Sequence, residues 1–200
     1  MVFLDFHVAG SLREGESLAR FSQYGGGGTP TVWVDGLERL SGSNDVASRY
    51  QNAFAAAEAD SANLSLAIDT GYDSPSGTTT ISVTVEIAEA VADYEDCVVQ
   101  IVVMEDEVTS RGNSFDRTVR QILDPVPLTV GAAGDRQTVV RTVDLGTGWQ
   151  PVNLSAVAWV HRASTGSGSS QEVLNAVQSQ SFGTTPIVKM SWGGVKAAYR

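Results

Sequence analysis

The sequence has little cysteine, histidine and positive charge. Its 200 residues contain one Cys, two His and 13 Lys and Arg against 23 Asp and Glu, so the formal net charge is -10 at pH 7. A single cysteine excludes an intrachain disulfide and a metal cage made of cysteines alone. The shortage of cations argues against a nucleic-acid partner, because affinity for nucleic acid comes mainly from Lys and Arg beside phosphates.

Further absences narrow the functional class. No run approaches the roughly 18 apolar residues that a membrane-spanning helix needs. The start, MVFLDFHVAG, lacks the basic region and the cleavage site of a signal peptide. Export is therefore argued from other features, or the natural start lies upstream. His7 and His161 have no second ligand at a metal-binding spacing, so neither a metal nor a cofactor is expected.

The first 60 residues mix short strand and helix patterns. Residues 2–8, VFLDFHV, read as a buried strand, and residues 14–24 place apolar side chains on one helical face. Residues 31–35 and 37–40 form two strand patterns around an Asp-Gly turn signal. The alanine-rich residues 44–59 predict a second helix.

After residue 60 the pattern changes to strand after strand. Alternating or β-branched segments occur at 64–69, 81–87, 97–104, 114–123, 137–145 and 152–162. No helical pattern interrupts them, so an antiparallel sandwich of six or seven strands is expected. Beyond it, QEVLNAVQ predicts a short helix, since Ser169 and Glu172 have the spacing of a capping box and Leu174 and Val177 are its packing candidates.

The stretch YGGGGTPTVWVDG places a proline at the entrance of a strand. Pro30 follows Thr29, and the strand ends at Asp35-Gly36. A cis X-Pro bond costs only about 0.5–1 kcal/mol over trans, so a tight turn can hold one there. The order of elements resembles the second half of the thioredoxin fold, whose core strand follows a cis-proline. That resemblance does not extend to redox chemistry, because the Cys-x-x-Cys motif is missing.

The chain as a whole resembles a more specific family. FLDFHVAG, ESLARFSQYG and GTPTVWVDG, followed by LSAVAWVHR and QEVLNAVQ, resemble the 28-kilodalton outer-membrane-protein-related family of exported bacterial proteins. The matching positions are His7, Arg20, Tyr24, Pro30, Asp35, Gly36 and Trp159. The resemblance implies a truncated thioredoxin-like part followed by an immunoglobulin-like β-sandwich, and it implies no catalytic residues.

We therefore expect an α+β protein with a partial thioredoxin-like α/β unit at 1–60. An antiparallel immunoglobulin-like β-sandwich with a short helix at 61–180 and a tail at 181–200 follow it. The thioredoxin sheet has its first strand between the second and third, and this chain lacks it. Residues 2–8 are thus expected to pair directly with residues 31–35 or to remain an exposed edge.

Other candidate sites are weak. Asp93 and Asp96 are the best candidates for a calcium site, but the usual ligand spacing is absent. Cys97 lies in an apolar run and is expected to be a buried thiol. The tail SWGGVKAAYR resembles short C-terminal segments of some exported bacterial proteins, which makes Trp192 and Tyr199 candidates for sorting or anchoring, the alternative being a flexible tail.

The sequence thus indicates a non-enzymatic, exported or surface-associated bacterial protein that acts by binding or assembly, with a protein or cell-surface partner. Thr29, Pro30, Asp35, Gly36, Trp192 and Tyr199 are its structural or interaction candidates. Two alternatives stay open. One is the remnant of a thiol oxidoreductase whose cysteine pair lies upstream, and the other is a carbohydrate- or peptide-binding sandwich of a larger secreted enzyme.

Overall fold

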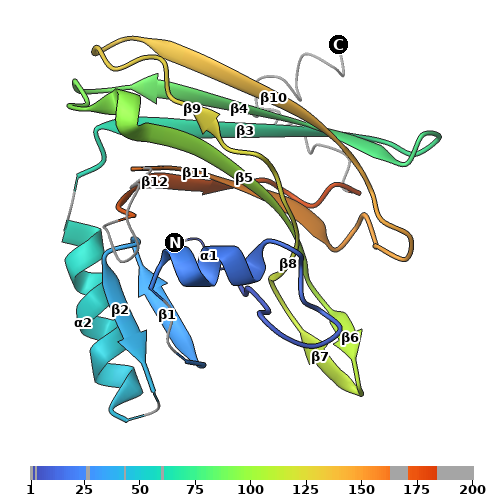
Figure 1. Cartoon of the computed structure of the whole chain (residues 1–200). Helices are drawn as coiled ribbons and strands as arrows, with labels where there is room; N and C mark the ends of the chain where they lie inside the picture. Colours follow the sequence, from blue (N-terminus) through green and yellow to red (C-terminus); the bar gives the residue numbers. More distant parts are fainter. Residues whose placement is uncertain are drawn as a thin grey trace, which may run out of the picture.

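The computed structural model describes residues 2, 4–25, 28–42, 44–59, 61–162 and 171–183. In this part of the chain antiparallel strands predominate, and the α-helices lie within the first 59 residues (Figure 1). The elements are α1 (Ser17–Gln23), β1 (Thr31–Val34), β2 (Glu38–Ser41), α2 (Val46–Ala59), β3 (Leu64–Asp73), β4 (Thr78–Ile87), a 3-10 turn η1 (Tyr94–Asp96), β5 (Cys97–Glu105), β6 (Val108–Ser110), β7 (Asn113–Phe115), β8 (Thr118–Ile122), β9 (Val126–Pro127), β10 (Arg136–Asp144), β11 (Leu154–Arg162) and β12 (Val173–Gln178). No helix among the described residues is long and apolar enough to span a bilayer.

Two antiparallel sheets face each other. One has the strand order β10-β4-β3, and the other has β12-β11-β5-β8, with β9 also paired to β5. The alternating apolar residues of β4 turn one face toward the space between the sheets, where Ile81, Val83 and Val85 have no exposed surface. From the other sheet, Val99 and Val103 fill the same core. Alternation thus produces a half-buried outer sheet.

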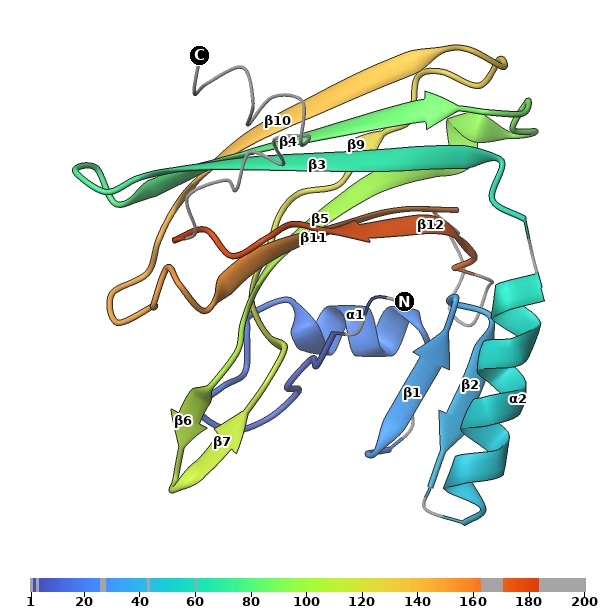
Figure 2. The same cartoon turned by 180° about the vertical axis from the view of Figure 1, so that it is seen from behind.

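The β12-β11-β5-β8 sheet is buried on both of its faces. Along β11, every residue from Leu154 to His161 is buried. Val157 and Trp159 belong to a second apolar cluster on the face turned away from the sandwich core. Helix α1 and the first residues of the chain lie on this outer face and form a third layer (Figures 1 and 2).

The N-terminal segment pairs with the sandwich, and both expectations for residues 2–8 are wrong. Asp5 forms an isolated parallel bridge with Thr118 at the start of β8. Its N–H donates to the Arg117 carbonyl at 2.9 Å, and its carbonyl accepts from Val119 N–H at 3.0 Å. The flanking Val2, Leu4 and Phe6 pack on the outer apolar cluster. Burial of these apolar side chains stabilises the segment in this position more than pairing with the four-residue strand β1 would.

The predicted thioredoxin-like α/β unit is also wrong. Strands β1 and β2 form a separate two-stranded antiparallel sheet, on which α2 packs through Ala53 and Leu40. Helix α1 lies on the outer face of the sandwich, where Arg20 contacts Gln100 of β5. The described chain is therefore mostly antiparallel β-structure with two short helices, because the larger apolar surface is on the sandwich. The domain division at about residue 60 stays a prediction.

Residues 173–178 form strand β12, so the helix predicted for QEVLNAVQ is wrong. β12 pairs antiparallel with β11, with Trp159 opposite Ala176, and has a register shift at Val160/His161. Leu174 and Val177 do pack against the main core, as expected of packing candidates. The free edge of β11 supplied partners for the backbone of this segment, and a long-range pairing of this kind overrides local helix propensity.

Candidate functional site

A cleft of about 1100 Å³ lies between the third layer, the β1-β2 unit and the outer face of the β12-β11-β5-β8 sheet. Its walls come from the N-terminal segment, α1, β1, the end of α2, β11 and β12. Representative lining residues are Leu4, Arg20, Tyr24, Trp33, Trp159 and Asn175. Parts of the chain far apart in sequence thus form one concave surface.

Aromatic side chains form one wall of the cleft. Phe21 lies in the last turn of α1 and Tyr24 is its C-cap, three residues further on, so both reach the same neighbour. Their rings lie 5.9 Å and 5.5 Å from the ring of Trp33 on β1, centroid to centroid. These contacts join α1 to the β1-β2 unit. They also give the cleft a broad apolar surface with polar edges.

Arg20 is a largely buried cation at the base of this wall. One of its terminal nitrogens, Nη2, donates to Oε1 of Gln100, and its Cζ lies 5.4 Å from the centroid of the Trp159 ring. Burial lowers the pKa of Arg20, and the Tyr24 hydroxyl opposes that effect. Arginine nevertheless stays protonated in proteins. Within the described residues, the salt bridges do not include Arg20.

Two buried donors beside the cleft have no hydrogen-bond partner among the described residues. They are Nη1 of Arg20 and Nε1 of Trp159. An unmade hydrogen bond at a buried donor costs about 1–3 kcal/mol. Gln100, the acceptor for Arg20, itself donates to the carbonyl of Ile101 at 3.1 Å and to that of Leu123. The Arg20 side chain is therefore held in place by a polar side chain that has its own partners.

His161 extends this polar group along β11. It is 3% exposed, and its Nδ1 lies 3.2 Å from the Arg162 carbonyl. Burial, and next the charge of Arg20, lower the pKa of His161 to about 4, so the imidazole is neutral at pH 7. Among the described residues no group of three or more His, Cys, Asp and Glu side chains is placed to hold a metal ion. This statement covers Asp93 and Asp96, the calcium candidates.

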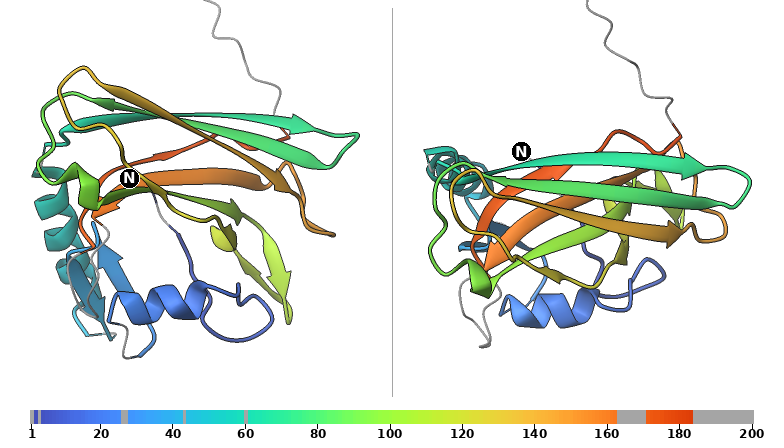
Figure 3. Two further views of the ribbon diagram at one scale, coloured as in Figure 1. Left: turned by 45° about the horizontal axis from the view of Figure 1, so that its top comes forward. Right: turned by 90° about the horizontal axis from the view of Figure 1, so that it is seen from above.

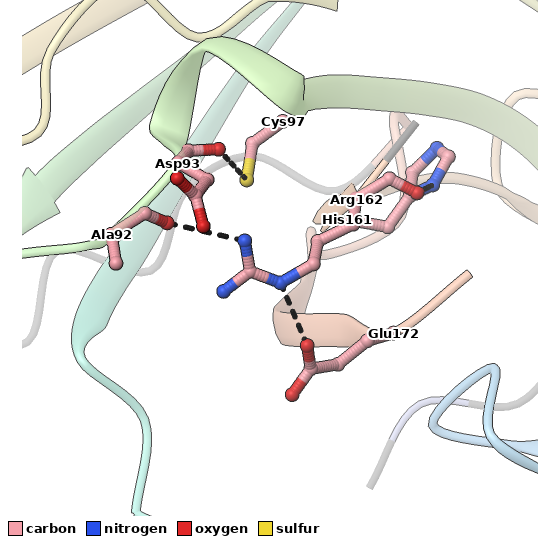
Figure 4. A network of polar contacts seen from close by, with 6 residues as sticks. All are labelled: Ala92, Asp93, Cys97, His161, Arg162 and Glu172. Atoms are coloured by element: carbon pink, nitrogen blue, oxygen red, sulfur yellow. Dashed lines mark hydrogen bonds and ion pairs between the residues drawn. The ribbon is translucent and has the colours of Figure 1, made fainter. Parts of the chain in front are cut away.

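Figure 4 shows the contacts at the end of β11. Arg162 donates from Nε to Oε2 of Glu172 at 2.8 Å and from Nη1 to the carbonyl of Ala92 at 3.1 Å. Cys97 is fully buried, and its Sγ lies 3.8 Å from the carbonyl of Asp93. Burial raises the pKa of the Cys97 thiol. The only cysteine is thus a protonated, enclosed thiol, which is the opposite of a reactive one.

The structure places Thr29, Asp35 and Gly36 at the edge of the cleft, while Trp192 and Tyr199 lie outside the described residues. The Thr29-Pro30 peptide bond is cis, the isomer expected from the sequence, and the Pro30 carbonyl accepts from Gly42 N–H at 3.3 Å. Asp35 and Gly36 form the β1-β2 turn, where both have positive φ. The turn contacts the start of β12.

Sequence reasoning missed the cleft itself. Trp33 and Trp159 lie in separate segments with strand patterns, and nothing in their spacing indicates that they meet. One signal was available: Gln100 interrupts the apolar run CVVQIVVM. A polar residue at the centre of a buried strand requires a polar partner. The partner, Arg20, is 80 residues away in sequence, so the signal indicates that a partner exists but not which one.

Comparisons with known proteins give weak likenesses. No family model and no curated protein matches the chain. A domain of the outer membrane lipoprotein Omp28 from Porphyromonas gingivalis is 17% identical, with a TM-score of 0.41, over 60% of this chain and 89% of that chain.

Two glucosidases are similar over a small part of their own length. Beta-glucosidase 3B from Thermotoga neapolitana is 11% identical, with a TM-score of 0.33, over 62% of this chain and 16% of that chain. The GH3 beta-glucosidase of Bifidobacterium adolescentis is 12% identical, with a TM-score of 0.30, over 66% of this chain and 20% of that chain. At such low identities and TM-scores, no property of these proteins is transferred.

Proposed function

We propose that the protein is a non-enzymatic binding protein of the bacterial surface and that the cleft holds its ligand. The observation that carries the proposal is the cleft of about 1100 Å³, with its aromatic wall and the two unpartnered donors of Arg20 and Trp159. Concave sites with apolar walls and a few placed polar groups are the usual form of ligand sites.

A peptide segment of a partner protein is the ligand class that fits best. Lining side chains carry both signs of charge, with Arg20, Arg117 and Arg162 among several carboxylates. A purely anionic or cationic ligand would meet repulsion from part of this wall. Tyr, Trp and Arg are the residue types enriched at protein interfaces, and a peptide supplies the carbonyl acceptors that buried N–H donors need.

The surface location and the family are part of this proposal. They rest on the resemblance of GTPTVWVDG, LSAVAWVHR and the other quoted segments to the 28-kilodalton outer-membrane-protein-related family. The net charge of -10 is in keeping with a partner other than nucleic acid. The thiol oxidoreductase alternative loses its basis, because the first 59 residues do not form a thioredoxin-like unit and Cys97 is enclosed.

Catalysis by His161, the buried histidine next to the cleft, is disfavoured by its state. The pKa of His161, about 4, leaves a neutral, 3% exposed imidazole that would have to move to reach a substrate. A general base acts best when its pKa is near the working pH and it lies within hydrogen-bond reach of the proton. These properties favour retention of a ligand over its conversion.

The proposal is tested with linear peptides selected from a random library on the intact chain. Trp33→Leu removes the centre of the aromatic wall. It is expected to raise the dissociation constant of the selected peptides at least about tenfold, the scale of one lost aromatic anchor. Val152→Leu is the matched control, because Val152 is 61% exposed and does not line the cleft. Circular dichroism establishes that each variant is folded. Peptides that bind Trp33→Leu as tightly as the unmodified chain would refute the proposed site.

A further inference from the structure

Strand β10 forms one edge of the outer sheet (Figure 3). It pairs with β4 along its whole length, from Arg136 opposite Glu86 to Asp144 opposite Thr78. Among the described residues no strand pairs with its other side. A nine-residue edge of this kind presents a row of backbone donors and acceptors to an incoming strand.

The backbone groups at that edge belong to the even-numbered residues. Just before β10, Ile87 N–H donates to the Asp135 carbonyl, and just after it, Leu145 N–H donates to the Gly77 carbonyl. The backbone N–H and C=O groups of the odd-numbered residues of β10 therefore face β4. Because the direction of N–H and C=O alternates along an antiparallel strand, residues 136, 138, 140, 142 and 144 direct theirs outward.

The side chains of the same five residues lie on the exposed face of the sheet. In order they are Arg136, Thr138, Val140, Thr142 and Asp144. Val140, at the centre, is 53% exposed, one of few large hydrophobic side chains in the described part of the chain with so much surface in contact with water. The odd-numbered Val139 and Val143 point into the core. The row begins with a cation, ends with an anion and has an apolar centre.

We propose that this edge pairs with the same edge of a second copy of the chain, antiparallel, with the two-fold axis at Val140. In that register Val140 lies opposite the partner's Val140, and Thr138 lies opposite the partner's Thr142. Arg136 lies opposite the partner's Asp144, once at each end. Every outward-facing residue then meets an outward-facing residue, so all of these pairs are hydrogen-bonded pairs.

The charge order decides in favour of this arrangement. Apolar, threonine and opposite-charge pairs each stabilise an antiparallel sheet by a few tenths of a kcal/mol, whereas like charges opposite each other destabilise it. A parallel pairing in register would set Arg136 against the partner's Arg136. The row is complementary to itself only when reversed, which identifies a second copy as the occupant. The product is one sheet running through two sandwiches.

Two side-chain contacts within the chain lie along this edge. Arg136 Nη2 donates to Oε1 of Glu86 at 2.9 Å, which keeps its guanidinium on the exposed face. Arg141 Nη1 donates to the Val140 carbonyl at 3.2 Å, so it occupies one acceptor of the free edge. Association exchanges that contact for the N–H of the partner's Val140. Because one hydrogen bond replaces another, this contact adds little to the net free energy of association.

Sedimentation equilibrium of the full chain over a range of concentrations tests the proposal. A dimer is expected, and Val140→Lys, which places two cations at the axis, is expected to raise its dissociation constant at least about tenfold. Asp144→Arg should weaken it as well. Adding Arg136→Asp to Asp144→Arg restores opposite charges across the interface and should recover much of the loss. Val152→Lys, a substitution at an exposed valine elsewhere, should have no effect.

Crosslinking gives a second readout that does not depend on weakening the fold. Across a hydrogen-bonded pair the Cα atoms are about 5.5 Å apart, a separation that a disulfide spans. Val140→Cys should therefore form a covalent dimer on mild oxidation, and Val152→Cys should not. A monomer at every concentration, or a dimer that Val140→Lys leaves unchanged, would overturn the proposal, since the edge would then be free or have another occupant.

Discussion

The backbone of Gly36 lies against the carbonyl group of Gln171, so that a Cβ at position 36 would be 2.0 Å from the carbonyl oxygen. Beside it, the Asp35 carbonyl accepts a hydrogen bond from Val173 N–H at 2.8 Å. The turn of the β1-β2 unit is thus fixed to the start of β12. This contact holds one wall of the cleft to the sandwich, and the close approach explains why a glycine stands at position 36.

Gly36→Ala is expected to loosen that attachment. Gly36 has φ +70, and a non-glycine residue in the left-handed region costs about 1–2 kcal/mol. The clash with Gln171 adds to that cost, because the neighbouring atom is backbone and must shift. Hydrogen exchange of β1, β2 and β12 should rise, and the urea midpoint followed by tryptophan fluorescence should fall.

Gly42→Ala is the matched control for this substitution. Gly42 is in the same unit with φ +80, but nothing lies within 4 Å of an added Cβ. It therefore incurs the backbone cost without the clash. Equal losses of stability in the two variants would show that contact with Gln171 has no effect, and the turn would then be held by other interactions.

His161 should make stability depend on pH. Its pKa falls from an ordinary 6.5 to about 4 on folding, so between these values the unfolded chain binds more protons. Stability from this group is full above pH 6.5 and is lost as the pH falls toward 4. The loss amounts to about 3 kcal/mol, at 1.36 kcal/mol for each pKa unit.

Urea unfolding of the unmodified chain and His161→Gln at pH 7 and pH 4.5 isolates this contribution. Carboxylates also titrate in the acid range, and the comparison between the two proteins removes their share. The unmodified chain should lose more stability than His161→Gln over this interval. A histidine resonance of residue 161 that titrates near 6.5 in NMR spectra would disprove the argument, since the ring would then not be desolvated.

The sequence predicts the elements whose signal is local. Alternation in residues 64–69 and 81–87 identifies β3 and β4, because one face of the outer sheet contacts water. The mainly apolar, non-alternating sequences of β5 and β11 also carry information, because both faces of their sheet are covered. That pattern indicates a third layer before any coordinates are known, although it does not say which segment forms it.

The features that the sequence did not predict depend on distant pairing. Residues 173–178 have a helical pattern but complete the β11 edge, and residues 2–8 have a strand pattern but lie on an apolar face. The cleft joins Arg20, Trp33 and Trp159, which no spacing in the sequence connects. Family resemblance placed Arg20 and Trp159 among matching positions without saying that they touch. Their contact follows only from the docking of α1.

Leu4→Asp tests whether the N-terminal segment covers the face of the β12-β11-β5-β8 sheet that is turned away from the sandwich core. Leu4 packs on the cluster that contains Val102, Met104 and Trp159. A carboxylate there must either be desolvated or expel the segment, at a cost of about 1–3 kcal/mol. Expulsion would expose apolar surface, so binding of the dye ANS and hydrogen exchange of β8 should both increase.

Leu18→Asp provides the comparison for Leu4→Asp, because Leu18 is 42% exposed on α1. The same change of charge there should leave ANS binding and the exchange of β8 almost unaltered, since a solvated carboxylate incurs little desolvation. If the two variants behave alike, net charge would account for the effect, and Leu4 would not anchor the third layer. If only Leu4→Asp exposes the sheet, the segment that the sequence assigned to a separate α/β unit is instead an integral layer of the sandwich.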